Sequence, residues 1–411
     1  MTRAMRLVVV MPALLALLAP VTAARAQTPF ALQNVGQRAT ADDARMVARG
    51  FGMTVTDSLH PGFKNVSSLS SLRHVALKFT GYGEQVDSRD ATGERRTYRT
   101  YSPDVRIAVP VFKSRLALTA GFSVDRNTAY HTLRDTAVQP PFWDPPEDEP
   151  DATLDGRYEF VREGSLYTVP LGVALQALPG ISLGASLNLV RGSNVDASSE
   201  YLRPPTVYVN TTVVAEEIYT GTSTTLALLL APGRRVRAGI SWTPAHDVEV
   251  DRKVELEGVA ERARSTFTMR MPQEVRAGVE ARILGRWRIG ADAHFAEFSE
   301  YRGREDWEQT MRDEYAWSAG LERIQARARR GGLSNLPLRI GTGYRRWAYT
   351  IGGAPVEEWT YAVGTGFPFR GDMGHLDLAV SWSQIGDRGD NGYESEIWRL
   401  TVSVTGLEAW W

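Results

Sequence analysis

The stretch from Thr168 to Gly192, TVPLGVALQALPGISLGASLNLVRG, constrains the fold of this chain more than any other feature. It alternates large apolar residues with small or polar ones, breaks at Pro179-Gly180, and then alternates again. Successive side chains of a β-strand point to opposite faces, so this alternation gathers the apolar residues on one face. Two such strands joined by a Pro-Gly turn predict a long amphipathic β-hairpin.

The same alternation recurs along the chain in fourteen segments. A transmembrane β-strand needs about 9 to 11 residues, whereas strands of soluble proteins average about five or six. Segment length therefore favours a transmembrane antiparallel β-barrel over a soluble sandwich. An even number of strands brings both chain ends to the same side of the membrane. The predicted strands cover residues 73–86, 98–112, 115–128, 158–178, 181–193, 217–231, 235–250, 264–283, 287–301, 313–324, 336–349, 357–369, 375–387 and 395–408.

The connections between the predicted strands alternate in length. Short turns such as 113–114, 232–233 and 284–285 are followed by long connections rich in charge, Pro and Gly. The longest contains the acidic stretch from Trp143 to Asp155. Short periplasmic turns and long outer loops are typical of bacterial outer-membrane barrels. We therefore predict an all-β fold located in the bacterial outer membrane.

The first residues predict an export signal. Arg3 and Arg6 precede the apolar run Leu7 to Ala19, and Ala24-Arg25-Ala26 provides a small-x-small cleavage site. We interpret residues 1–26 as a Sec signal peptide. The alternative, an N-terminal membrane anchor, needs about 18 or more unbroken apolar residues.

Several stretches together resemble the FadL/TodX family of outer-membrane transporters for long-chain fatty acids and other hydrophobic compounds. The similarity is carried by the order and spacing of the opening hairpin and of GTSTTLALLLAPGRRVRAGISWTP, MPQEVRAGVEARILGRWRIGADAHFAEFSEY, LPLRIGTGYRR and HLDLAVSWSQIGDRGDNGYESEIWRLTVSVTG. The resemblance implies a barrel of about fourteen strands with an N-terminal plug, or hatch, inside its lumen. It also implies passive uptake of a hydrophobic small molecule.

Residues 27–72 correspond to the hatch of that family, and residues 73–411 to the barrel. The stretch Asn65 to Leu69 resembles an Asn-Pro-Ala-x-Leu element of the family, with Val66 and Ser67 replacing its Pro and Ala. A mobile periplasmic tail is the alternative, because chain termini are commonly disordered.

Glycines near the middle of many predicted strands fall on the inward face. They could leave room for another backbone or a ligand, or they could relieve curvature in a closed barrel. The sequence leaves both interpretations open. The inward glycines are Gly121, Gly172, Gly184, Gly239, Gly278, Gly290, Gly320, Gly341 and Gly364.

Composition and motifs favour a protein that is not an enzyme. Cysteine is absent, so disulfide and thiol chemistry are excluded, and the net charge of −1 argues against nucleic-acid binding. No HExxH, GxSxG or EF-hand pattern occurs, so we predict no catalytic residues, metal site or cofactor. Asp292 and His294 share an inward face and could form an acid–base pair, but we expect them to bond to the hatch.

Apolar residues outside the predicted lipid belt are the candidates for ligand binding. In the outer connections we predict capture by Phe142, Trp143, Leu202, Val207 and Val209. Inside the barrel, we predict that Phe30, Leu32, Phe51, Met53 and Phe63 of the hatch line a dry pocket. Alternatively, the first group packs the loops together and the second fixes the hatch.

The remaining expectations concern partners. We predict a monomer in contact with outer-membrane lipid and lipopolysaccharide, with a hydrophobic small molecule as ligand. Trp410-Trp411 at the chain end resembles the signal that the barrel-assembly machinery reads, although both residues could instead belong to an aromatic girdle. Two other functions stay open: a structural or adhesive barrel without transport, and a barrel-type hydrolase.

Overall fold

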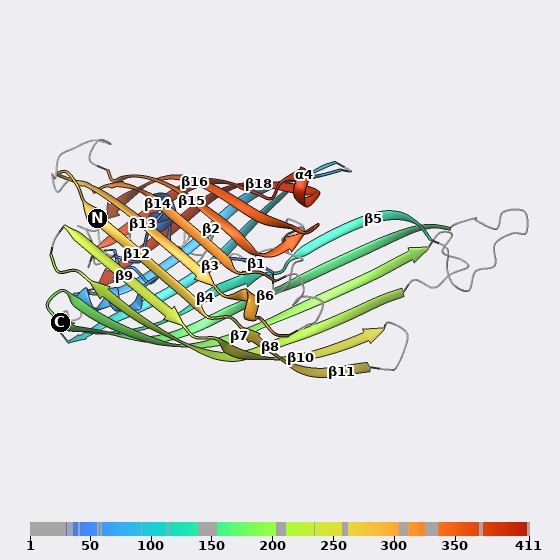
Figure 1. Ribbon diagram of the computed structural model, residues 1–411, viewed down its shortest axis with the longest axis horizontal. Helices are drawn as coiled ribbons and strands as arrows, with labels where there is room; N and C mark the ends of the chain where they lie inside the picture. Colours follow the sequence, from blue (N-terminus) through green and yellow to red (C-terminus); the bar gives the residue numbers. More distant parts are fainter. Residues whose placement is uncertain are drawn as a thin grey trace, which may run out of the picture.

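The computed structural model describes residues 30, 36–39, 42–55, 57, 60–91, 93–112, 115–138, 154–202, 211–233, 235–256, 262–303, 311–324, 336–369 and 373–408. The predicted signal peptide lies outside these residues. Their strands form one antiparallel sheet, in which β18 returns to pair with β2 and closes a barrel (Figure 1). No described helix combines the length and the apolar character needed to cross a membrane.

The barrel has fourteen strands, three of which are interrupted once, and every predicted strand overlaps an observed one. The prediction of a fourteen-stranded barrel is therefore confirmed. The strands are β2 (Val75–Asp90), β3 (Glu94–Phe112), β4 and β5 (Leu116–Asn127, Tyr130–Val138), β6 (Leu154–Leu178), β7 (Ile181–Leu202), β8 (Thr211–Leu230), β9 and β10 (Val236–Thr243, His246–Leu256), β11 and β12 (Arg262–Met271, Glu274–Arg282), β13 (Trp287–Ala296), β14 (Glu314–Arg323), β15 (Leu338–Ile351), β16 (Ala354–Phe369), β17 (Gly374–Ile385) and β18 (Tyr393–Glu408).

Several strands extend beyond their predicted ends. Strands β5, β6, β7, β8, β10 and β11 project together past the rest of the barrel (Figure 1). Leu202, predicted to lie in an outer connection, is instead the last residue of β7, and β5 occupies part of another predicted loop. Beyond the lipid belt, backbone hydrogen bonds still hold the ladder while no lipid requires an apolar face. The sequence there, such as 193–199, therefore lacks the alternation that predicts a strand.

The outer surface of the barrel is apolar around its middle. Leu171, Val173 and Leu175 of β6 are exposed, and the neighbouring strands add Leu183 and Leu226. A continuous exposed apolar belt is unfavourable in water and matches the lipid-facing surface of a membrane barrel. On β14 to β16, the rings of Trp317, Tyr344 and Trp359 contact one another on this surface, as in the aromatic girdles of membrane proteins.

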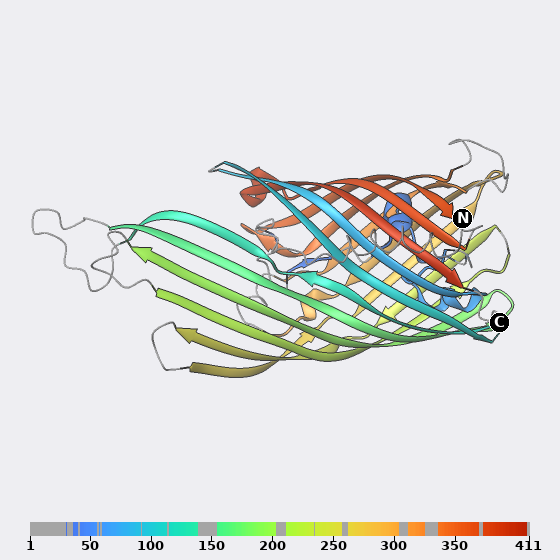
Figure 2. The same ribbon diagram turned by 180° about the vertical axis from the view of Figure 1, so that it is seen from behind.

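The described residues between 30 and 72 lie inside the barrel, and we call them the inner segment. It contains β1 (Gln37–Arg38), α2 (Ala44–Arg49) and the 3₁₀ helix η2 (Val66–Ser71), drawn in blue within the lumen (Figure 2). The Asp43 carboxylate caps the start of α2, and Gly50 ends the helix in the left-handed conformation. Helix α2 contacts β14 to β18, whereas η2 contacts β4, β6, β7 and β8.

A row of inward glycines receives the inner segment. There are six of these glycines, one on each of six strands. A Cβ added to any of the six would lie under 3.0 Å from an atom of residues 48–53. Room for another backbone is thus the main reason for these glycines, although Gly121 instead faces the Arg106 side chain and the wall. From β9 through β12 to β16, the row consists of Gly239, Gly278, Gly290, Gly320, Gly341 and Gly364.

Candidate functional site

Helix α2 is attached to the wall by buried ion pairs. The Glu322 carboxylate of β14 accepts hydrogen bonds from Arg45 Nε at 2.8 Å and Arg49 Nη1 at 2.8 Å. Arg339 of β15 reaches the same carboxylate at 3.1 Å and Asp377 of β17 at 2.6 Å. A buried carboxylate needs such partners to remain charged. These bonds fix both the position and the rotation of α2.

A second ionic cluster holds β1. Arg38 lies 2.8 Å from the Glu274 carboxylate and 3.3 Å from that of Glu314. Arg276 pairs with Glu274 at 2.8 Å, and Arg345 pairs with Glu314 at 2.7 Å. Glu274 and Glu314 are therefore each paired with arginines.

Asp292 and His294 both bond to the inner segment. Asp292 accepts hydrogen bonds from the backbone N–H groups of Gly52 at 2.7 Å and Met53 at 3.2 Å. His294 Nε2 lies 3.2 Å from Arg38 Nη1. Each side chain of the candidate acid–base pair thus holds a different part of the inner segment. Within the described residues, no group of three or more His, Asp and Glu side chains could hold a metal ion.

Asp43 attaches the start of α2 to β2 through a charged hydrogen bond. Its carboxylate accepts a hydrogen bond from Lys78 Nζ of β2 and another from the backbone N–H of Met46 at 2.8 Å. Burial alone would raise the pKa of Asp43, but the Lys78 ammonium and these hydrogen bonds hold it at about 2. Asp43 therefore stays charged over the physiological pH range.

The end of the lumen near the short turns is closed by apolar packing, which we call the apolar seal. Val66 and Leu69 of η2, with Leu72, pack on small residues at the ends of five strands. The wall side of the seal consists of Ala76, Ala108, Ala117, Ala174, Ala227 and Leu407.

A cavity of about 400 Å³ lies between the inner segment and the wall. Val66 and Leu69 of the apolar seal border it, and of the four described hatch residues predicted to line a dry pocket only Phe63 does so. Most of the wall of this cavity carries hydroxyl, amide and charged groups. Among these are Thr119, Ser123, Thr168, Ser186, Asn188, Ser223, Thr225, Ser241, Thr243, Ser318, Thr360, Ser381 and Ser383. A dry ligand pocket lined by the hatch residues therefore stays a prediction.

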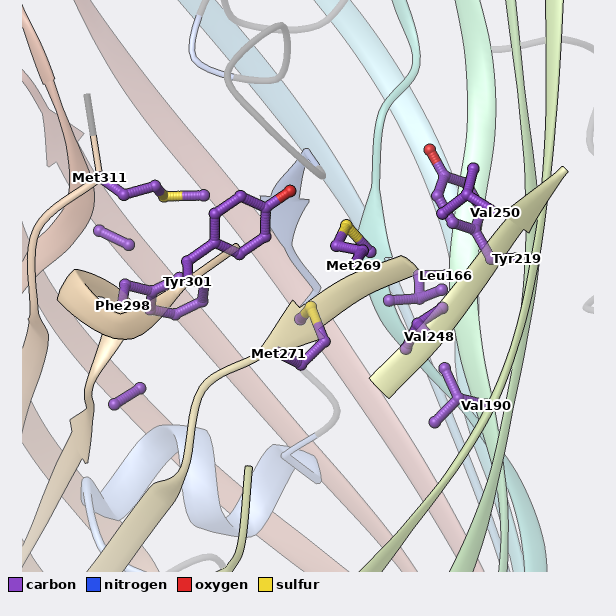
Figure 3. Packing of buried hydrophobic residues seen from close by; sticks show 12 residues of the cluster. Leu166, Val190, Tyr219, Val248, Val250, Met269, Met271, Phe298, Tyr301 and Met311 are labelled. Carbon is purple, nitrogen blue, oxygen red and sulfur yellow. The ribbon is translucent and has the colours of Figure 1, made fainter. Parts of the chain in front are cut away.

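On the outer side of the cavity lies an apolar group of twelve buried residues, which we call the outer cluster (Figure 3). Three of its members, Leu166, Val190 and Met271, also line the cavity. The buried outer cluster thus extends from the projecting strands to the edge of the cavity. The other members are Tyr219, Val248, Val250, Met269, Ala296, Phe298, Tyr301, Met311 and Ala348, of which Phe298 belongs to η3 (Phe298–Glu300).

The remaining predicted site residues lie elsewhere. Phe51 packs on Gly290 and under the Arg49 guanidinium, 4.2 Å from its ring centroid. Met53 lies against the glycines of β9 and β12, and Phe30 packs on Tyr393 with ring centroids 4.8 Å apart. These three contacts hold the inner segment, and a role in ligand binding stays a prediction. Outside the described residues are Leu32, Phe142, Trp143, Val207 and Val209, and of Leu202 only the backbone is described.

Sequence analysis missed Arg126 of β4, which lines the cavity and is buried. Simple alternation places Asp125 inward and Arg126 toward lipid. A β-bulge between Val124 and Arg126 in the pairing with β6 turns Arg126 into the lumen instead. An arginine at a lipid-facing position of a strand is the signal that could have predicted this bulge.

Comparison with known proteins places this geometry in context. The BamG family model matches residues 1–411. The structure is similar to a Pseudomonas aeruginosa FadL homologue, with a TM-score of 0.57, 11% identity, and coverage of 90% of this chain and 99% of that one. It is also similar to the Pseudomonas putida toluene transporter TodX, with a TM-score of 0.56, 15% identity, and coverage of 92% and 100%.

At these identities the structural likeness shows the fold alone. A search of curated protein sequences finds no match. The family model, in contrast, spans every residue of the sequence. The chain therefore belongs to the BamG family, and its fold is a FadL-like barrel.

Proposed function

We propose that the protein is a bacterial outer-membrane channel for passive uptake of hydrophobic small molecules such as long-chain fatty acids. The observation that supports this proposal is the cavity above the inner segment, which the outer cluster borders through Leu166, Val190 and Met271. A purely structural barrel has no need of a ligand-sized cavity at this place. The toluene transporter TodX has a similar fold, and its class of cargo enters as part of this proposal.

The proposed path begins at the projecting strands. Because the outer cluster is buried, its side chains must separate to admit a hydrophobic molecule, which gains about 25 cal/mol for each Å² of apolar surface it buries there. Leu166, Val190 and Met271 then lead it to the cavity. The inner segment acts as a hatch, because the apolar seal blocks direct passage to the short-turn end. Release therefore requires part of the inner segment to move.

Uptake in vesicles tests this proposal. Reconstituted full-length protein should admit labelled palmitate, and Met271→Asp, which places a charge on the path, should reduce the initial rate by about tenfold or more. The control is Leu171→Ile on the lipid-facing surface, which should leave the rate unchanged. No uptake by the wild type, or equal rates for wild type and Met271→Asp, would favour the structural barrel.

Native mass spectrometry supplies a second test. After gentle detergent extraction, the full-length protein should retain a hydrophobic compound that a variant lacking residues 27–72 has lost. Retention by the variant would place the ligand away from the inner segment.

A second candidate function follows from the family. The name BamG points to the barrel-assembly machinery, and we propose that the barrel associates with that machinery as a structural component. The many fixed contacts of the inner segment are compatible with a barrel that stays closed. Affinity purification of the tagged protein from outer membranes should then recover the machinery's subunits in fixed ratio. Their absence after crosslinking would remove this candidate.

A further inference from the structure

Three exposed arginines lie together at the short-turn end of the barrel, which faces the periplasm in outer-membrane barrels. Arg235 precedes β9, Arg282 is the last residue of β12, and Arg286 precedes β13. Strand β12 pairs with β9 on one side and with β13 on the other (Figure 1). The Arg282 backbone N–H donates a hydrogen bond to the Arg235 carbonyl at 2.7 Å, so these two residues continue the β9–β12 ladder. We call Arg235, Arg282 and Arg286 the arginine group.

The arginine group lies on the lumen side of the rim. Residues two apart in a strand share a face, so Arg235 shares a face with Arg237, and Arg286 with Arg288. Arg237 and Arg288 both point into the barrel, where they pair with the buried Glu280 carboxylate at 3.5 and 3.4 Å. The arginine group therefore lines one side of the periplasmic mouth.

Apolar residues occupy the lipid side of the same rim. Val236, Ile283 and Leu284 are each more than half exposed. Val236 and Ile283 directly follow Arg235 and Arg282, and they point to the opposite face of their strands. The rim thus presents apolar side chains toward the membrane and cations toward the periplasmic mouth.

The positive charge of the arginine group is not compensated by the described part of the chain. No described carboxylate forms an ion pair with these three residues, and Glu280 on the same face already pairs with Arg237 and Arg288. Like charges at neighbouring positions of a ladder repel each other. The connections at this end add a single acidic residue in the sequence, Asp372. They cover residues 113–115, 179–180, 231–235, 283–286, 324–337 and 370–373.

The outer end of the barrel differs in this respect. There Arg157 pairs with Asp135 at 2.9 Å, and Lys253 pairs with Glu255 at 2.7 Å, although all four side chains are exposed. Such exposed pairs contribute little to stability, but they leave the outer surface close to neutral. An excess of exposed positive charge at the periplasmic mouth is complementary to an anionic partner.

From this charge distribution we propose that the periplasmic mouth is a docking surface for an acidic segment of a periplasmic protein. Each guanidinium can donate two parallel hydrogen bonds to a carboxylate, and the three lie close enough to bind successive acidic residues of one segment. Phospholipid head groups are the other anions near this rim, but the lipid side carries Val236, Ile283 and Leu284. The proposal concerns the mouth of the barrel and does not depend on the cargo.

Binding of a defined acidic peptide tests the proposal. The full-length protein is placed in nanodiscs of phosphatidylcholine, which has no net charge and leaves both ends of the barrel accessible. It is titrated with deca-glutamate and, as the uncharged control, deca-glutamine, each carrying a neutral dye. We expect only deca-glutamate to bind, with an affinity that falls as salt is added, because salt screens exposed charges. No binding of deca-glutamate at low salt would overturn the proposal.

Variants then assign the binding to the arginine group. Arg235→Gln/Arg282→Gln/Arg286→Gln should weaken the binding of deca-glutamate by about tenfold, because three exposed charge pairs are lost. The matched control, Arg96→Gln/Arg157→Gln/Lys253→Gln, removes three exposed cations at the outer end and should weaken it by less than about twofold. An equal loss in the two variants would show that only the overall charge matters, and would overturn the proposal.

A double variant covers the case in which the triple variant does not fold. Arg235→Gln/Arg286→Gln keeps the hydrogen bond from Arg282 Nε to the Gly285 carbonyl at 2.8 Å, and should weaken binding by about fivefold. Unchanged affinity in a folded double variant would count against the proposal.

Lipid retention distinguishes a protein partner from the membrane surface. In native mass spectra after gentle detergent extraction, wild type and triple variant should retain equal amounts of phosphatidylglycerol. Lower retention by the triple variant, together with unchanged affinity for deca-glutamate, would assign the arginine group to lipid head groups and overturn the proposal.

Discussion

The two helices of the inner segment, α2 and η2, are attached to the barrel by different forces. Helix α2 is bound to β14, β15 and β17 through Glu322, whose carboxylate bonds three arginines. The 3₁₀ helix η2 is held by apolar packing on alanines, reinforced by the Ser70–Ser182 hydroxyl contact at 2.8 Å. Ion pairs are directional and require a fixed geometry, whereas apolar packing tolerates small shifts and excludes water.

This difference indicates which end of the inner segment can move. Breaking the Glu322 cluster would leave buried charges without partners, at a cost of about 3 to 5 kcal/mol. The apolar seal could open if η2 moved away from the alanines of the wall. This movement would leave no charged group in apolar surroundings. If a ligand displaces the inner segment, we therefore expect η2 to separate while α2 stays in place.

The largest effect is expected for Glu322→Gln. It removes the negative charge between Arg45, Arg49 and Arg339, and should destabilise the docking of α2 by about 3 to 5 kcal/mol. Hydrogen exchange of residues 44–53 should increase, while exchange of residues 66–72 changes little. The control is Asp135→Asn, which removes an exposed ion pair with Arg157 and should cost less than about 1 kcal/mol. Equal exchange at both ends would show that the two attachments are one cooperative unit.

A smaller effect, located at η2 and not at α2, is expected for Leu69→Ala in the apolar seal. The side chain is 1% exposed, and its truncation leaves a cavity costing about 2 to 4 kcal/mol. Exchange should now increase at residues 66–72 and not at 44–49. Ion conductance in planar bilayers should rise relative to Glu322→Gln, because water reaches the seal. Unchanged conductance would mean that the seal is not the barrier.

Gly341→Ala tests the glycine row with a single methyl group. A Cβ there would lie 2.7 Å from the backbone nitrogen of Gly50 and 3.0 Å from the Ala48 carbonyl oxygen. Overpacking of this kind costs about 1 to 3 kcal/mol, and protease sensitivity of the inner segment should increase. Gly406→Ala is the matched control, because an added Cβ would have no atom within 4 Å. Equal behaviour of the two variants would show that the inner segment is not tightly docked.

The smallest effect is the pH dependence contributed by Asp43. Its pKa is lowered from 3.8 to about 2 in the folded protein, so its contribution is complete above about pH 4 and is lost as the pH falls through about 2. The difference between these two pKa values corresponds to about 2 kcal/mol of stability for the docking of α2. Protection factors of α2, which are the intrinsic exchange rate divided by the observed rate at each pH, should be lower at pH 2.5 than at pH 5, and Asp43→Asn should reduce the difference. A wild type with the same protection factors at both pH values would contradict the assignment.

The sequence by itself determined the barrel. Lipid outside and polar groups inside require an alternation of period two, and that period is local, so strands such as β6 and β17 could be predicted within a few residues. The inward glycines could likewise be predicted from the alternation, although their purpose could not. Only the structure shows that Gly341 and its neighbours receive residues 48–53.

The tertiary structure alone decided the contents of the lumen. Glu322 and Arg45 are 277 positions apart in the sequence, and nothing local indicates that they form a pair. The long outer parts of β7 and β8 lack alternation because no lipid faces them. Simple alternation would place Arg126 on the lipid face, because a single bulge reverses the alternation beyond it. Local periodicity therefore fixes the wall of this protein, whereas its candidate site depends on contacts between distant residues that only the closed barrel brings together.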